Sequence, residues 1–281
     1  MRLALTPPFD VAAALGGLAA HAVPGAERTD LAAASHTRTV PAPHGTALVI
    51  VHLAETHAEA TLDLAHPDDE AAVLAAVRFW LDLDADPAAV AEHLRTDLAL
   101  APLVGARPGL RVLGHVDGFE AAASTVLGQQ VSLAAGRTFV GRLVAAYGTA
   151  APGGFAAFPR PERLAAATPE ELQRAVRITG ARSRTLQALA AACADGLTIG
   201  PGGDLDRTRQ KLRALPGIGP WTVDYLSLRA LGDRDAFPSG DLVLRRALGG
   251  VDAAAAVALA ERWRPWRAYA VTHLWTRASY L

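Results

Sequence analysis

The stretch that most constrains this chain runs from residue 215 to residue 241 and reads LPGIGPWTVDYLSLRALGDRDAFPSGD. Its Gly-Ile-Gly turn separates two helical patterns, at residues 204–214 and 220–231. Pro220 opens the second pattern, at a position where its missing N–H costs least. Glycines at positions 217 and 219 permit positive φ and let another backbone approach closely. The pattern therefore predicts two helices joined by a tight turn, and a third helix that begins at Asp241.

The turn between the first two helices is a candidate anion site. The amides of Gly217, Ile218, Gly219 and the first helical turn through Thr222 are expected to point outward, where such groups bind phosphate oxygens. The alternative is an ordinary corner between two core helices, because turn glycines are common. The full string LPGIGPWT is far more specific than a bare Gly-x-Gly, and it favours the phosphate site.

Charge is distributed unevenly along the 281 residues. Residues 1–100 carry 5 arginines and 14 acidic residues, a net charge of −9, whereas residues 101–281 carry 22 basic and 14 acidic residues, a net charge of +8. This asymmetry predicts a basic C-terminal two-thirds that meets phosphates and an acidic N-terminal part that faces away. The single cysteine, Cys193, excludes an intramolecular disulfide and a four-cysteine metal or iron–sulfur site.

The fold class predicted from these patterns is α+β and mostly α. Residues 1–66 contain short β-rich runs and one small-residue helix, which predicts an antiparallel sheet domain, and residues 67–281 are predominantly helical. The segment 103–118 is expected to be a loop and residues 149–161 a Gly/Pro linker. Five histidines of the sheet domain lack metal-ligand spacing and are expected at its surface; they are His36, His44, His52, His57 and His66.

The chain shows no membrane segment. It has no uncharged apolar run of 18 residues, and its first ten residues are broken by Pro7 and Pro8 rather than forming a signal peptide. We therefore expect a cytoplasmic protein with no membrane partner.

Four stretches carry a family resemblance: LPGIGPWT with FPSGD, ARPGLR at 106–111, VDGFEAAASTVLGQQVS at 116–132 and ERWRPWRAYAVTHLW at 261–275. Together they resemble the AlkA-type 3-methyladenine DNA glycosylases II of the helix-hairpin-helix (HhH-GPD) superfamily, over nearly the full length. The resemblance implies that residues 67–281 form two helical subdomains, with the hairpin at about 204–231 and the active-site cleft between them. It also implies a monomer that acts on duplex DNA with alkylated bases near the nucleoid. No cofactor or metal is expected, apart from an optional monovalent cation at the hairpin carbonyls.

Asp241 is the candidate catalytic residue. It lies 22 residues after Gly219, at the position of the family's catalytic aspartate. Cleavage of an N-glycosidic bond builds positive charge at C1′, which a carboxylate stabilises while it orients or deprotonates water. An alkylated purine is already cationic, so no second carboxyl is needed to protonate the leaving group. The alternative is an ordinary N-cap, the commonest role of an aspartate at a helix start.

Three aromatic residues, Trp221, Tyr225 and Trp275, are candidates for the base pocket. Trp221 and Tyr225 are four residues apart and so share one helix face. Plain core packing is the alternative. In the family, the matching aromatic side chains line an electron-rich pocket, where a cationic base gains cation–π attraction of roughly 0.5–2 kcal/mol.

Gln129 and Gln130 are candidates to fill the gap left by a flipped nucleotide. Gln130 departs from the apolar wedge known at this position, and it either hydrogen-bonds the orphaned base or caps a helix. Gly240 and Gly17 are further departures, since relatives place an acid and an aromatic residue there. Both suggest a more open pocket.

The sequence predicts hydrolysis without strand cleavage. Lyases of the superfamily place a nucleophilic lysine where this chain has Trp221, and the only lysine, Lys211, precedes the hairpin. We therefore expect a monofunctional glycosylase. Two alternatives remain: a glycosylase for a deaminated or oxidised base, and a non-catalytic module that only binds DNA through its hairpin.

Overall fold

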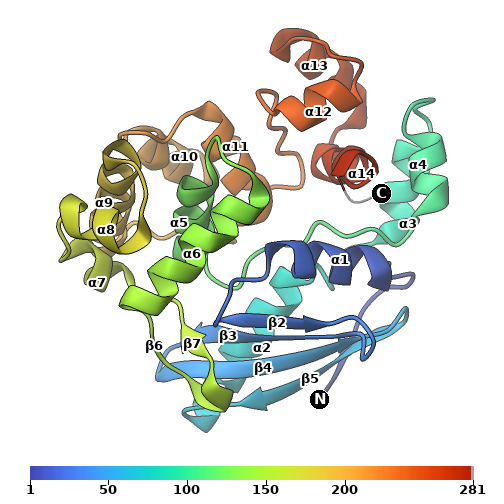
Figure 1. Cartoon of the computed structure of the whole chain (residues 1–281). Coiled ribbons are helices and arrows are strands. Elements are labelled where there is room, and N and C mark those ends of the chain that lie inside the picture. Colours follow the sequence, from blue (N-terminus) through green and yellow to red (C-terminus); the bar gives the residue numbers. More distant parts are fainter. Residues whose placement is uncertain (280–281) are drawn as a thin grey trace.

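The computed structural model describes residues 1–279 and contains a small sheet domain and two helical lobes (Figure 1). The strands are β1 (Arg2–Ala4), β2 (Glu27–Asp30), β3 (Ser35–Ala42), β4 (Gly45–Leu53), β5 (His57–Asp63), β6 (Thr149–Ala150) and β7 (Ala156–Ala157). The helices up to residue 150 are α1 (Val11–His21), α2 (Glu70–Trp80), α3 (Pro87–Leu94), α4 (Ala101–Ala106), α5 (Gly118–Gly128) and α6 (Leu133–Tyr147). The later helices are α7 (Pro161–Ala165), α8 (Pro169–Val176), α9 (Gly180–Ala194), α10 (Leu205–Arg213), α11 (Pro220–Arg229), α12 (Leu242–Ala247), α13 (Ala253–Ala260) and α14 (Arg267–Ser279). Short 3₁₀ turns are η1 (Pro67–Asp69), η2 (Pro152–Gly154) and η3 (Glu261–Trp263).

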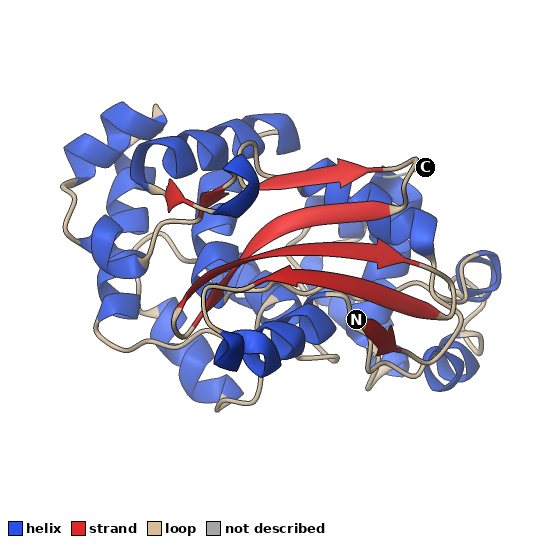
Figure 2. Ribbon diagram, turned by 90° about the horizontal axis from the view of Figure 1, so that it is seen from below, coloured by secondary structure: helices blue, strands red, loops and turns tan. Residues whose placement is uncertain are grey.

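The N-terminal strands form an antiparallel sheet in the order β1-β5-β4-β3-β2. The longest pairing joins β3 to β4, from Ser35 opposite His52 to Ala42 opposite Gly45. Helices α1 and α2 bury apolar side chains against the sheet, including Leu15, Val77 and Trp80. Seen from below, the strands lie in front of most of the helices (Figure 2). The predicted α+β, mostly α class is confirmed.

The helices after the sheet domain form two lobes with separate cores. The first, which we call the hairpin lobe, consists of α5–α11, whose core includes Leu127, Leu186 and Leu226. The second, the aspartate lobe, combines α3 and α4 with α12–α14, and Leu94, Val104, Leu244 and Trp263 share its core. In Figure 1 the hairpin lobe lies to the left of α1, and the aspartate lobe lies above α1 and to its right. The aspartate lobe is thus assembled from two distant parts of the chain.

Several local expectations are corrected by the structure. His36, expected at the surface, is fully buried; its Nδ1 lies 2.8 Å from Thr29 Oγ1 and its ring packs against Trp80. The segment expected as a loop from residue 103 begins inside α4, and the expected linker contains the β6–β7 hairpin. Strand β2 was not expected, because its sequence ERTD is charged and lacks the apolar alternation of a strand.

Candidate active site

The helix-hairpin-helix turn needs a glycine at one of its two glycine positions. Gly217 has φ of +79°, and a Cβ placed there would lie 2.1 Å from Thr185 Oγ1. Gly219 has φ of −88° and ψ of 176°, so only Gly217 of the two uses the positive φ that glycine permits. No atom lies within 4 Å of where a Gly219 Cβ would be. The first N–H groups of α11 have no helical hydrogen-bond partner. Because Gly219 has no side chain to cover them, these N–H groups are accessible to an anion.

Gln129 links the α5–α6 turn to the hairpin. Its Nε2 donates to the carbonyl oxygen of Gly217 at 3.1 Å and to Thr222 Oγ1 at 3.0 Å. Thr222 is buried, so its hydroxyl faces inward rather than toward a phosphate. Gln130 is exposed and adopts a positive φ of 54° at the tip of the turn. Of the two glutamines, Gln130 is therefore the one that extends from the protein.

Asp241 is the N-cap of α12, and both of its carboxylate oxygens accept hydrogen bonds. Oδ1 accepts from the backbone N–H of Leu244 at 2.8 Å and from Trp275 Nε1 at 3.1 Å. Oδ2 accepts from Trp221 Nε1 at 2.9 Å. The N-cap role is therefore real, and it coexists with two indole contacts that a helix cap does not require. Two indoles from different lobes orient this carboxylate.

The aromatic candidates lie around Asp241. The rings of Trp221 and Tyr225 stack with centroids 5.3 Å apart and an interplanar angle of 23°. Tyr225 and Trp275 lie 5.9 Å apart at 46°. All three side chains are partly exposed, unlike the core aromatics. A cavity of about 190 Å³, which we call the base pocket, is lined by Asp241, Tyr225 and Trp275.

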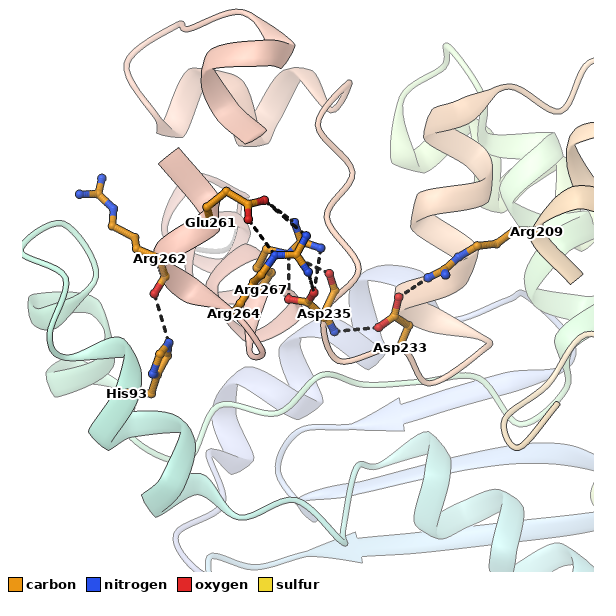
Figure 3. Close-up of polar contacts among 8 residues, drawn as sticks. All are labelled: His93, Arg209, Asp233, Asp235, Glu261, Arg262, Arg264 and Arg267. Atoms are coloured by element: carbon orange, nitrogen blue, oxygen red, sulfur yellow. Dashed lines mark hydrogen bonds and ion pairs between the residues drawn. The ribbon is translucent and has the colours of Figure 1, made fainter. Parts of the chain in front are cut away.

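The loop between α11 and α12, which leads to Asp241, is fastened to both lobes. Asp235 accepts hydrogen bonds from Arg267 at 2.8 and 2.9 Å and also pairs with Arg264, both in the aspartate lobe. Asp233 pairs with Arg209 of α10 in the hairpin lobe. Figure 3 shows these side chains converging on the loop. The charges of this loop therefore hold the segment before Asp241 between the lobes.

Several residues of the base pocket were missed from the sequence. The missed wall residues include His21 of α1, Leu113, Arg229 of α11, Val243 and Thr272. Arg229 follows Trp221 and Tyr225 at intervals of four on the same helix face, a signal that could have identified it. Burial, with Arg229 nearby, lowers the pKa of His21 to about 4. No comparable sequence signal marks His21 or Leu113.

Lys211 is exposed in the last turn of α10. Within residues 1–279, no group of three or more His, Cys, Asp or Glu side chains is arranged to hold a metal ion. None of the helices described is long and apolar enough to cross a membrane.

Two family models match consecutive parts of this chain. The AlkA N-terminal domain matches residues 1–117, and the model described as "HhH-GPD superfamily base excision DNA repair protein" matches residues 123–264. The chain belongs to the HhH-GPD superfamily. The family resemblance inferred from the sequence is confirmed.

Individual relatives agree with this family. The chain is 42% identical to a Mycobacterium tuberculosis protein named probable bifunctional transcriptional activator/DNA repair enzyme AlkA, which it matches over 100% of its own length. It spans only 57% of that relative's length. It is 34% identical to Escherichia coli DNA-3-methyladenine glycosylase 2, over 96% of this chain and 94% of the relative. Among solved structures, a 3-methyladenine DNA-glycosylase from Archaeoglobus fulgidus has the same fold, with a TM-score of 0.87 and 19% identity over 99% of this chain and 98% of that one.

Proposed function

We propose that this chain is a monofunctional DNA glycosylase that flips alkylated bases out of duplex DNA and hydrolyses their glycosidic bond. The observation that carries the proposal is the shared hydrogen bonding of Asp241 by Trp221 and Trp275. This arrangement holds a carboxylate beside stacked aromatic rings in a pocket between the lobes. The Escherichia coli relative, named DNA-3-methyladenine glycosylase 2, supports alkylated purines as the substrate class.

The reaction follows from one carboxylate and a cationic base. As the bond between C1′ and the base nitrogen breaks, the base takes the electron pair and leaves neutral, while positive charge develops on the sugar. Asp241 stabilises that charge electrostatically. Water then forms a bond to C1′ and gives its proton to the carboxylate. The products are the free base and an intact strand with an abasic site.

Selection of the base depends on the rings and on the leaving group. A cationic ring beside Trp221 and Tyr225 gains cation–π attraction of roughly 0.5–2 kcal/mol over a neutral one. That range corresponds to at most about 30-fold, since 1.4 kcal/mol is tenfold. The larger part of the selectivity therefore comes from the weakened bond of the alkylated nucleotide.

Double-stranded DNA is the partner in this proposal. The hairpin amides of Gly217, Ile218 and Gly219 bind a phosphate, and Gln130 enters the gap left by the flipped base. We further propose that the protein works as a monomer in the cytoplasm and needs no cofactor. A monovalent cation at the hairpin carbonyls would steady the turn without entering the reaction.

Base release from defined duplexes tests this function. Wild-type protein is incubated with methylated DNA, with duplex that contains hypoxanthine, and with duplex that contains 8-oxoguanine, and free bases are separated by chromatography. Release of 3-methyladenine and 7-methylguanine is the expected result. Release of only hypoxanthine or 8-oxoguanine would assign a different lesion, and DNA binding with no release would make the chain a binding module.

A further inference from the structure

The base pocket shares a wall with a second, larger cavity. This side chamber has a volume of about 560 Å³, within the range of roughly 300–1,000 Å³ that is typical of small-molecule sites, whereas the base pocket has about 190 Å³. Residues of four different parts of the chain line both cavities; they are Gly17, His21, Leu113, Tyr225, Arg229 and Val243. A group bound beside Asp241 therefore lies next to the chamber rather than against a closed wall.

Gly17 lies at the boundary between the base pocket and the side chamber and has no side chain to fill the space there. It lies in the middle of α1, where glycine costs about 1 kcal/mol relative to alanine. A Cβ at this position would meet only Leu113 Cδ1, at an ordinary contact distance of 3.7 Å. The backbone is helical, so neither packing nor conformation requires a glycine here. Its missing side chain enlarges the space between the two cavities.

The side chamber has a charged wall with an excess of cations. Arg38 pairs with Glu27 at 3.2 Å and with Glu120 at 2.6 Å, which occupies both carboxylates. Arg137 and Arg229 also line the chamber, and neither has a carboxylate within 4.0 Å among residues 1–279. Burial raises the pKa of Glu120, and the adjacent Arg38 guanidinium opposes this shift.

Two buried donors or acceptors on this wall are unused. Arg229 Nε and His115 Nδ1 are both buried with no hydrogen-bond partner among the described residues. A buried polar atom without a partner costs about 1–3 kcal/mol, so both atoms raise the free energy of this wall. A negatively charged oxygen beside the Arg229 guanidinium would lower the electrostatic cost of the wall.

We propose that the side chamber is a subsite for the substituent of the flipped base, and that it selects N-alkyl groups that end in a carboxylate. This inference rests on the proposed function and names a substrate class within it. The cationic purine lies in the base pocket against Tyr225 and Trp275, and the carboxylate arm extends past Gly17 into the side chamber along Arg229, whose side chain lines both cavities. The cationic ring of this zwitterionic adduct contacts the aromatic side chains, and its carboxylate contacts the Arg229 guanidinium.

Three alkylating agents provide matched substrates. Duplex DNA is treated with dimethyl sulfate, propylene oxide or β-propiolactone, which add methyl, 2-hydroxypropyl or 2-carboxyethyl groups to purine nitrogens. The last two arms have similar size but differ in charge. Release of each 7-substituted guanine and 3-substituted adenine is measured by chromatography and divided by its spontaneous release from the same DNA. For at least one purine, we expect about tenfold greater acceleration for carboxyethyl than for hydroxypropyl, the effect of one charge-assisted hydrogen bond.

Two variants test separately how the width of the passage and how the charge of Arg229 affect base release. Gly17→Phe should lower the release of both long arms relative to methyl by at least about fivefold, because a ring at this position fills the passage. Gly16→Phe, on the same helix but lining neither cavity, is the control. Arg229→Gln should lower the carboxyethyl-to-hydroxypropyl ratio about tenfold and leave the hydroxypropyl-to-methyl ratio unchanged. Because all ratios come from one preparation, partial unfolding cancels.

The outcomes distinguish a failure of the proposed subsite from a failure of the proposed function. No release of methylated bases would overturn the proposed function itself. Release of methylated bases with equal acceleration of carboxyethyl and hydroxypropyl groups would overturn the subsite alone. A carboxyethyl preference that survives Arg229→Gln would also overturn it, because the selecting cation would then lie elsewhere.

Discussion

Replacing Asp241 with asparagine should abolish base release while preserving the helix that it caps. Asparagine is as good an N-cap as aspartate, so its side-chain oxygen can still accept from Leu244 N–H. Its amide then occupies the other position and faces Trp221 Nε1, which loses an acceptor 2.9 Å away. The variant therefore removes the negative charge and one hydrogen bond without removing the cap.

Each of these losses has a predictable size. Unit charges about 4 Å apart at an effective dielectric constant of about 20 interact by about 4 kcal/mol, so the charge at C1′ loses that stabilisation. Such a loss slows the reaction by about 10³-fold. The unpartnered indole N–H costs about 1–3 kcal/mol of folding free energy, a decrease in Tm of a few degrees.

Single-turnover release of 7-methylguanine from methylated duplex measures the rate, and a duplex with a tetrahydrofuran abasic analogue measures binding. We expect DNA affinity within a few-fold of wild type. Asp252→Asn is a matched control, because Asp252 caps α13 with the same 2.8 Å bond to a backbone N–H but contacts no indole. An Asp241→Asn protein that retains more than about a tenth of the wild-type rate would refute the assignment.

Three further predictions concern the hairpin, the reaction type and pH. Gly217→Ala should lose stability by about 1–3 kcal/mol through its positive φ and the nearby Thr185, whereas Gly219→Val should fold normally and weaken binding to damaged and undamaged duplexes alike. Borohydride present during turnover should trap no protein–DNA adduct, because Trp221 has no amine for attack on C1′ and Lys211 lies exposed on α10. Burial lowers the pKa of His36 from 6.5 to about 3, so the folded state excludes a proton that the unfolded state binds below pH 6.5. Stability should therefore fall as pH falls from 6.5 toward 3, by up to about 1.4 kcal/mol per pH unit from this residue, in thermal melts across that range.

Each of these predictions has a result that contradicts it. Gly219→Val that impairs only lesion recognition would exclude the hairpin as the phosphate anchor. A trapped band that disappears in Lys211→Arg would show that this lysine reaches the sugar. His36→Asn should reduce the acid slope, to which His21 and His273 also contribute because burial lowers their pKa values to about 4, and exposed His52→Asn should leave the slope unchanged. Equal slopes in the two variants would show that His36 is not the linked group.

The hairpin was accessible from the sequence because its pattern is local, whereas the catalytic role of Asp241 is what the family resemblance implies. Gly217, Pro220 and the spacing of Trp221 and Tyr225 follow from turn chemistry and the helical repeat. The same four-residue spacing extends to Arg229. This residue was missed because the prediction stopped at the two aromatic residues. The domain boundary between residues 66 and 67 stays a prediction.

Other features were not accessible because they depend on distant partners. His36 is buried since Trp80 of α2 packs on it, and nothing in the local sequence distinguishes it from exposed His52. The charged sequence of β2 predicts a loop. Its pairing with β3 depends on a distant partner, because Arg38 of β3 forms an ion pair with Glu27 of β2. Cavity walls that combine α1 with α11 cannot be predicted from either helix alone.

The composite aspartate lobe has a consequence for biosynthesis. Its N-terminal helices α3 and α4 leave the ribosome more than a hundred residues before α12, α13 and α14 arrive to bury them. The hairpin lobe is contiguous and can fold as soon as α11 has emerged, whereas α3 and α4 must wait with apolar faces exposed. Such late, non-local closure is slow and open to off-pathway association. A nascent chain from which α11 has emerged, but α12, α13 and α14 have not, should therefore bind chaperones through α3 and α4 while its hairpin lobe is already folded.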